Sequence, residues 1–160
     1  MRSVSVLVLT LFILLVQSSC KKATDSNSSS QVQQPPVSVD SMFRCHTATA
    51  LDSAGIRSGL LGKWQWEFIR CYWNPEDANG DDFKNLAVEI KADNTVTVKE
   101  NGVTTQTATW ALTRLNDGYF KLTTNPLVLQ LPGRIYLCSD RVLFFDSYID
   151  GCDNFFKKQY

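Results

Sequence analysis

One segment of the chain could bind a ligand by aromatic stacking and charge pairing. In GKWQWEFIRCYW, residues 62–73, every second position is aromatic or basic: Trp64, Trp66, Phe68, Arg70 and Tyr72. Alternate residues of a β-strand share one face, so a strand here would gather these side chains into one wall. The rings would hold an apolar body, and the guanidinium would pair with a carboxylate or a phosphate.

Two structural alternatives stay open for this segment. Arg70 could reach solvent or form an internal ion pair with Asp146 or Asp153, because a buried charge needs a partner. The aromatic row could also be ordinary core packing. The sequence alone does not choose between these roles and ligand binding.

Catalytic chemistry has little support in the sequence. His46 is the only histidine, and there is no Gly-x-Ser-x-Gly motif, no His/Cys spacing typical of a metal site and no glycine-rich phosphate loop. The pair Asp81-Asp82 lies in a polar stretch and is expected to be solvated. We therefore expect no enzyme activity, no cofactor and no bound metal.

The N-terminal residues are typical of an export signal. Val4 to Val16 is almost wholly apolar but too short to span a membrane, and small residues precede Cys20. The run LLVQSSC resembles the lipobox of bacterial lipoproteins, and SSCKK is similar to the relaxed lipoboxes of Bacteroidota. This resemblance implies a signal peptide over 1–19 and lipid attachment at Cys20, on the outer membrane and facing the periplasm or the cell surface. In the alternative, Cys20 is a disulfide partner in an ordinary exported protein.

The next segment is expected to be a flexible tether over residues 20–44, because it is rich in Ser, Gln and Pro and has no apolar period. The chain has 16 basic and 16 acidic side chains, which gives no reason to expect nucleic acid as a partner. We expect a monomer. Asp40-Ser41 and Asp52-Ser53 resemble the O-glycosylation sites of Bacteroidota, and whether either is modified stays open.

Residues 45–160 are predicted to form one all-β domain, because period-two alternation and turn dipeptides recur at short intervals. Seven of the expected strands span 63–72, 86–92, 95–100, 104–114, 119–123, 141–148 and 152–159. The remaining strand is 127–131, 134–138 or a bent union of both. Sequential strands with tight turns predict an antiparallel up-and-down barrel of eight strands, and TATALDSAGIRSGLL before the first strand predicts a short helix that closes its lower end.

The folded part resembles a lipocalin-like domain of Bacteroidota lipoproteins. Gly62-Lys63-Trp64 is similar to the Gly-x-Trp that opens lipocalin barrels, and DGCDNFFKKQY is similar to the end of these bacterial domains. The resemblance implies a barrel that binds small apolar molecules, and a basic residue, Lys157 or Lys158, packed over Trp64.

Four cysteines follow Cys20, and the barrel topology pairs them. If the first strand runs upward, Cys71 lies at its upper end, and Cys152 lies at the upper end of the last strand, which is its neighbour in a closed barrel. Cys138 ends a downward strand at the lower end, near the point where Cys45 precedes the first strand. We therefore predict the disulfides Cys71–Cys152 and Cys45–Cys138.

An inward Trp64, as in lipocalins, predicts that the whole row from Trp64 to Tyr72 is inward. With Cys71 and Cys152 outward, Asp153, Phe155 and Lys157 would also be inward. The same alternation predicts an inward row on the following strands: Leu86, Val88, Ile90, Val96, Val98, Ala108, Trp110, Leu112, Phe120 and Leu122. The orientation of 141–148 stays open, because both faces of that segment are apolar.

Two functions are compatible with these features. In the first, a membrane-anchored barrel holds a small apolar or amphipathic molecule against Trp66, Phe68, Arg70, Tyr72, Trp110 and Phe120. In the second, the barrel is filled, and loops such as 74–82 and 123–134 bind another protein, as in an inhibitor. An open cavity of a few hundred Å³ would favour the first, and side chains that meet across the barrel axis would favour the second.

Overall fold

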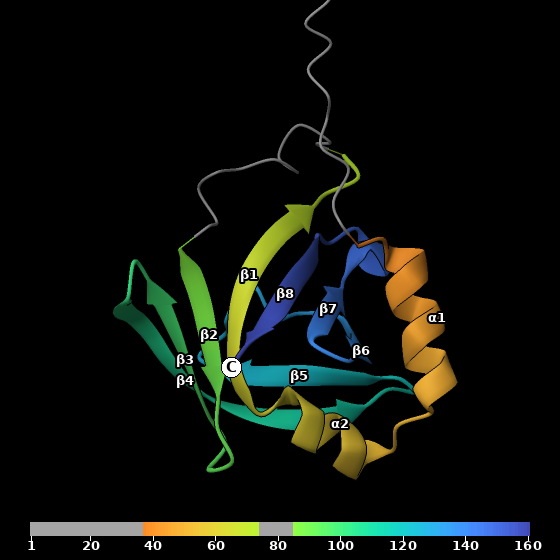
Figure 1. Ribbon diagram of the computed structural model, residues 1–160, viewed down its shortest axis with the longest axis horizontal. Coiled ribbons are helices and arrows are strands. Elements are labelled where there is room, and N and C mark those ends of the chain that lie inside the picture. The colour runs from red at the N-terminus through yellow and green to blue at the C-terminus, as the bar shows by residue number, and fades with distance from the viewer. Residues whose placement is uncertain (1–36, 74–84) are drawn as a thin grey trace, which may run out of the picture. The chain divides into compact units, whose positions relative to one another are not determined.

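The chain folds into a closed antiparallel β-barrel with two helices packed against it (Figure 1). The structure, a computed structural model, describes residues 37–73 and 85–160. Its elements are α1 (Val39–Thr49), α2 (Ser53–Leu60), β1 (Gly62–Arg70), β2 (Leu86–Ile90), β3 (Thr95–Glu100), β4 (Val103–Arg114), β5 (Phe120–Asn125), β6 (Arg134–Cys138), β7 (Arg141–Phe145), the 3₁₀ helix η3 (Ser147–Ile149) and β8 (Asp153–Gln159). Each strand pairs with the next, and β8 pairs with β1. The predicted eight-stranded barrel is confirmed.

The two ends of the barrel are formed by different connections, because consecutive antiparallel strands alternate in direction. One end, called here the α2 end, carries residues 91–94, 115–119 and 139–140 and the start of β1, which directly follows α2. The other, called the loop end, carries residues 71–73 after β1 and residues 101–102, 126–133 and 146–152.

Turn residues place these connections as the sequence predicts. Asn101 and Gly102 both have positive φ, 52° and 78°, as a type I′ hairpin requires. The alternatives for the sixth strand resolve to β6, Arg134–Cys138, whereas 127–131 belongs to a loop. The seventh strand ends at Phe145, earlier than predicted, and the chain continues into η3.

The barrel interior is filled by side chains. Residues from all eight strands meet in one buried cluster, which also includes Ile56 and Leu60 of α2. These two side chains are fully buried and close the α2 end, as predicted for the helix before β1. Val128 and Leu131, at 0% and 1% exposure, close the loop end. The predicted inward residues of β2 to β5 belong to the cluster, with Leu112 and Phe120 packed at its margin.

Helix α1 was not predicted, and it corrects the expected boundary between tether and domain at residue 45. The helix begins at Val39, and Ser38 caps it through a reciprocal pair of hydrogen bonds with Ser41. Met42 is 2% exposed and packs on the outer face of the barrel against Phe68 and Phe155. The folded domain therefore includes residues 39–44.

The position of α1 explains why both faces of β7 are apolar. Val142 and Phe144 point into the barrel, and Leu143 points outward into a second buried cluster beneath α1. The orientation that the sequence left open is thereby resolved.

A β-bulge in β1 corrects the predicted inward row. Trp66 pairs with Phe156 and Phe68 with Phe155, so Glu67 is the extra residue. Up to Trp66 the row is inward as predicted, but beyond the bulge the side chains change face. Phe68 stacks on Phe155 in the outer cluster, with ring centroids 4.1 Å apart.

The same bulge reverses the predicted faces of β8. Phe156, not Phe155, packs inside the barrel. Lys158, not Lys157, lies over Trp64, with its ammonium nitrogen 5.0 Å from the ring centroid. Lys158 also donates a hydrogen bond of 3.0 Å to the Gly59 carbonyl of α2.

Both predicted disulfides are present, one near each end of the barrel. Cys45–Cys138 joins α1 to the last residue of β6, with Cα atoms 5.7 Å apart. Cys71–Cys152 joins the segments after β1 and before β8 at the loop end, with Cα atoms 4.5 Å apart.

Candidate ligand-binding groove

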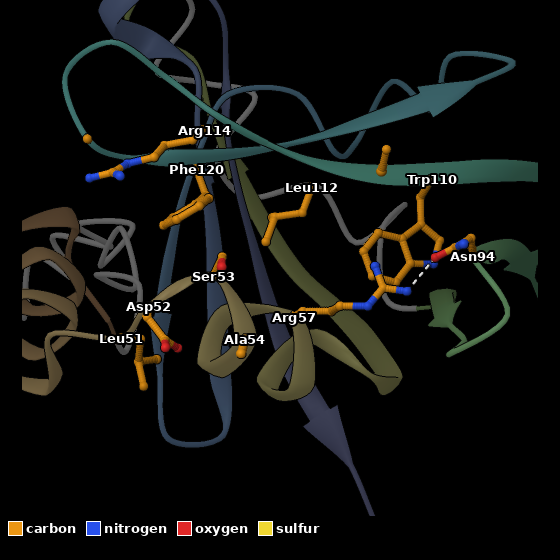
Figure 2. Close-up of a pocket in the computed structure, with 12 residues that line it drawn as sticks. Leu51, Asp52, Ser53, Ala54, Arg57, Asn94, Trp110, Leu112, Arg114 and Phe120 are labelled. Atoms are coloured by element: carbon orange, nitrogen blue, oxygen red, sulfur yellow. Dashed lines mark hydrogen bonds between the residues drawn. The ribbon is translucent and has the colours of Figure 1, made fainter.

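A groove of about 900 Å³ lies at the α2 end, between the first part of α2 and the strands β4 and β5 (Figure 2). It lies at the mouth of the barrel, because its floor is made by inward-facing residues at the ends of these strands. The packed interior lies beyond this floor. A ligand in the groove would thus contact the barrel's inner surface only at its mouth.

The floor of the groove is apolar. Trp110 and Leu112 of β4 and Phe120 of β5 belong to the inward rows, in register across the pairs Leu112–Leu122 and Arg114–Phe120. Figure 2 shows Leu112 and Phe120 pointing from the strands toward α2. They are only partly buried. The floor can therefore contact an apolar group.

The opposite wall comes from α2 and the residues before it. Asp52 caps α2, its Oδ1 accepting a hydrogen bond of 2.8 Å from the Gly55 N–H. Leu51 and Ala54 add apolar surface to the groove. Asp52 thus has a structural role at the start of α2.

Arg57 and Trp110 close one end of the groove. The Arg57 guanidinium lies 4.4 Å from the centroid of the Trp110 ring and donates a hydrogen bond to Asn94 Oδ1 (Figure 2). It also donates a hydrogen bond to the Ala92 carbonyl. The Trp110 Nε1–H donates a hydrogen bond of 3.0 Å to the Lys91 carbonyl. These contacts fix a cation and a ring in place before any ligand binds.

Arg114 lies at the other end of the groove from Trp110 (Figure 2). Within the described parts of the chain, 37–73 and 85–160, its side chain has no hydrogen bond or ion pair. Its guanidinium is therefore available for an anionic group of a ligand, in contrast to that of Arg57.

The structure brings together two of the six predicted ligand-binding residues, Trp110 and Phe120. Trp66 lies in the packed interior. Phe68 lies beneath α1, on the outside of the barrel. Tyr72 follows β1 and is 61% exposed. The expectation that Phe68, Arg70 and Tyr72 line the interior is wrong, because the bulge at Glu67 shifts the alternation.

Arg70 makes the internal ion pair that the sequence left open. Its Nη2 lies 3.6 Å from Asp153 Oδ2 and donates a hydrogen bond of 2.8 Å to the Tyr72 hydroxyl. Asp153 is fully buried and accepts hydrogen bonds from the backbone N–H groups of Asp146 and Ser147 and from the Ser147 hydroxyl. Burial raises the pKa of the Asp153 carboxyl, and these hydrogen bonds together with Arg70 oppose that rise. Arg70 therefore has a structural partner.

Sequence reasoning missed the α2 side of the groove. Ile56 and Leu60 at spacing i, i+4 identify the buried face of α2. Arg57 is the neighbour of Ile56, so it belongs at the edge of that face. The sequence therefore indicated a basic residue at the edge of the buried face of α2. It did not indicate that this edge faces β4, and without that the residue could not be assigned to the barrel mouth.

A smaller hollow of about 330 Å³ adjoins the groove and shares Leu51, Gly118 and Phe120 with it. His46 of α1 lines this hollow, and its Nδ1 accepts a hydrogen bond of 3.2 Å from the Leu137 N–H of β6. β6 pairs with β5 only at Lys121–Arg134, so the His46 ring gives β6 an additional contact at this seam. Burial lowers the pKa of His46, and the Leu137 carbonyl oxygen, 3.4 Å from Nδ1, partly opposes this because it can accept a hydrogen bond from the protonated ring.

Neither a metal centre nor a spanning helix occurs among the described residues. No three His, Cys, Asp or Glu side chains gather there closely enough to hold a metal ion. None of the helices in 37–73 and 85–160 is long and apolar enough to cross a membrane. The expected signal peptide and Cys20 lie outside the described residues.

Comparisons with protein-family models, curated proteins and solved structures give no match to this chain.

Proposed function

We propose that the protein is a membrane-anchored, lipocalin-like binding protein without enzyme activity, which holds a small apolar or amphipathic molecule in the groove at the α2 end. The observation that carries this proposal is the groove itself, with an apolar floor of inward-facing residues and charged side chains around it. Its volume of about 900 Å³ is near the upper limit for small-molecule sites.

The packed interior moves the proposed site from the barrel axis to its mouth. Trp66 and Phe156 stack inside the barrel with ring centroids 6.2 Å apart, and the interior cluster continues to both closed ends. Placing a ligand there would require these side chains to leave a close-packed core. The groove accepts a ligand without such a change.

The charges of the groove suggest which amphipathic molecules bind best. Arg57 and Arg114 contribute two positive charges against the one carboxylate of Asp52, which is engaged in capping α2. A carboxylate or phosphate head group would pair with Arg114 while its apolar part covers Leu112 and Phe120. We therefore expect an anionic amphiphile to bind better than a cationic one of the same length.

The anchor belongs to the same proposal and rests on the sequence. Cys20 is the acylation site expected from LLVQSSC, and the chain between it and Val37 connects the domain to the membrane. Mass spectrometry of the N-terminal peptide from the native host tests this part: a diacylated or triacylated Cys20 is expected, and an unmodified Cys20 or an intact signal peptide would contradict it.

A second candidate is an interaction surface on the loops, which the filled interior favours. Of the two loops expected to carry it, 74–82 lies outside the described residues. The other, 123–134, exposes Leu127 and Leu129 at 63% and 73%. Leu129→Ser separates the two candidates, because it should weaken a contact made by the loop end and leave binding in the groove unchanged.

Titration with dodecanoate, followed by calorimetry, tests the groove. Ala54 lines the groove and is exposed, so Ala54→Trp fills the site without changing the core. Ser58→Trp is the matched control, because Ser58 is exposed on the same helix but is not a groove residue. We expect the dissociation constant to rise about tenfold or more in A54W only, a change of about 1.4 kcal/mol. Equal affinity of wild type and A54W would contradict the proposed site.

A further inference from the structure

Exposed apolar side chains gather at the loop end of the barrel. Among the described residues, nine large hydrophobic side chains are exposed. Seven of them belong to the loop end: Tyr72, Trp73, Val103, Leu127, Leu129, Tyr148 and Ile149. Of the other two, Phe43 lies on α1 and Tyr160 is the last residue. Such concentration of apolar surface at one end is typical of an interaction surface rather than of scattered exposure.

These side chains are held outward by ordered loops. In the loop before β6, Leu127 and Leu129 are exposed, whereas Val128 between them is fully buried. The Val128 N–H donates a hydrogen bond of 2.8 Å to the Thr124 hydroxyl, which fixes this orientation. The exposed leucines are therefore not core residues that failed to pack.

The neighbouring loops are fixed as well. The buried carboxylate of Asp153 accepts two backbone N–H groups at the start of η3, which carries Ile149. The disulfide Cys71–Cys152 holds the segment of Trp73 close to the start of β8. The apolar side chains thus project from several separate loops around one end, as a ring and not as a single pocket.

The chain enters the folded domain from this same end. Cys45, near the end of α1, is bonded to Cys138 toward the α2 end, and residues of the last turn of α1 line a hollow with the turn 117–119. The start of α1 therefore points toward the loop end (Figure 1). As a flexible chain, the segment from Cys20 to Val37 would have a root-mean-square reach of about 25 Å. A lipid on Cys20 would thus keep the loop end close to the bilayer.

We propose that the loop end is a membrane-contact surface whose apolar side chains enter the interfacial region of a zwitterionic bilayer. This inference rests on the proposed lipid anchor and is independent of the ligand in the groove. Trp and Tyr are the side chains preferred at the membrane–water interface, and both occur here. The described ionisable side chains at this end include Glu100, Asp146, Asp150 and Asp153 against Arg70 and Arg134, whose guanidinium lies 3.8 Å from the centroid of the Tyr148 ring. Positive charge is thus not in excess here, and anionic lipid is not expected to strengthen the contact.

A bilayer fits this surface better than a protein partner. A protein-binding site concentrates its apolar anchors in a well-packed centre, whereas these side chains stand on separate loops around the rim. A bilayer can receive side chains in such an arrangement, because lipid adapts to their positions. Anchoring also raises the local concentration of bilayer, so that even a weak contact is populated.

Trp73 provides the test. It is 60% exposed, whereas Trp64, Trp66 and Trp110 are at most 6% exposed. The acylated protein is reconstituted into vesicles of phosphatidylcholine with brominated acyl chains, which quench the emission of tryptophan in contact with them. We expect quenching relative to unbrominated vesicles, loss of that quenching in Trp73→Phe, and no increase when anionic lipid is added.

Two further variants separate contact from anchoring. Leu129→Ser should weaken vesicle binding of unacylated Cys20→Ser protein about tenfold, the effect of losing one leucine contact with lipid. Tyr160→Ser, at the α2 end, should leave that binding unchanged. Acylated protein that floats with the vesicles but shows no quenching would overturn this inference and leave the anchor and the groove intact. Failure to float would overturn the anchor together with this inference.

Discussion

The two ends of the barrel differ in the exposure of their apolar side chains. At the α2 end, Ile56 and Leu60 are fully buried and seal the core. At the loop end, Val128 and Leu131 seal the core, while their neighbours Leu127 and Leu129 face solvent. Apolar residues at the α2 end mainly stabilise the fold and line a groove. At the loop end, some of them remain exposed to solvent. A hydrophobic pattern alone therefore does not separate core residues from exposed ones.

The largest expected effect comes from removing the disulfide near either end. Cys45–Cys138 and Cys71–Cys152 have sequence separations of 93 and 81. In the chain-entropy model, a disulfide that closes a loop of this length stabilises the fold by about 4 to 5 kcal/mol, because it restricts the unfolded chain. Replacing either pair by serine should lower the free energy of unfolding by a similar amount, measured by urea unfolding. A loss below about 1 kcal/mol for one pair would contradict the expectation that the two disulfides stabilise the fold by similar amounts.

A matched pair of isoleucines tests the contrast between the ends directly. Ile56 is fully buried in α2, and Ile149 is 63% exposed in η3. Ile56→Ala should lower the free energy of unfolding by about 2 to 5 kcal/mol, because it leaves a cavity in the core. Ile149→Ala should change it by less than about 0.5 kcal/mol. Equal losses in thermal or chemical unfolding would show that η3 is part of the core.

Two adjacent lysines test how α2 is held on the barrel. Lys158 lies over Trp64 and bonds to the Gly59 carbonyl, whereas Lys157 is exposed. Lys158→Ala should lower the free energy of unfolding by about 1 to 2 kcal/mol through the lost cation–π contact and hydrogen bond. Lys157→Ala should have almost no effect. The reverse order would mean that β8 has the register without the bulge.

The two ends should also respond oppositely to pH. His46 has a lowered pKa in the folded protein, so below about pH 6.5 the unfolded chain binds the proton more tightly and stability falls with falling pH. Asp146 and Asp153 at the loop end have raised pKa values, because of burial first. Their contribution therefore falls as pH rises from about 4 through the raised values.

His46 is the only histidine, so His46→Gln isolates its part of this profile. The difference between wild type and H46Q in free energy of unfolding should decrease as the pH falls below about 6.5. Urea unfolding at a series of pH values measures it. A difference that is constant with pH would mean that His46 is not held neutral against Leu137.

Much of the barrel could be predicted because its signals are local. Asn101-Gly102 specifies a hairpin, and period-two alternation gives the faces of β2 to β5. The closed topology then placed Cys71 next to Cys152. The bulge at Glu67 could not be predicted, because a single inserted residue leaves the apolar pattern almost unchanged while reversing the faces beyond it.

The candidate site was only partly predictable for a related reason. Trp110 and Phe120 were identified by alternation, but the groove exists only because α2 covers one part of the barrel mouth and leaves another uncovered. Helix α1 was missed because, of its residues, only Met42 is deeply buried. Both failures concern packing between distant segments, which short-range patterns do not encode.

The central claim is that any small ligand binds at the mouth of the barrel and not inside it. The indole N–H signals of the four tryptophans report on separate regions: Trp64 and Trp66 on the interior, Trp110 on the groove and Trp73 on the loop end. In a ¹H–¹⁵N titration with dodecanoate, the Trp110 signal is expected to shift while those of Trp64 and Trp66 stay in place. Shifts of Trp64 and Trp66 with an unchanged Trp110 would contradict the claim and return the ligand to the barrel interior.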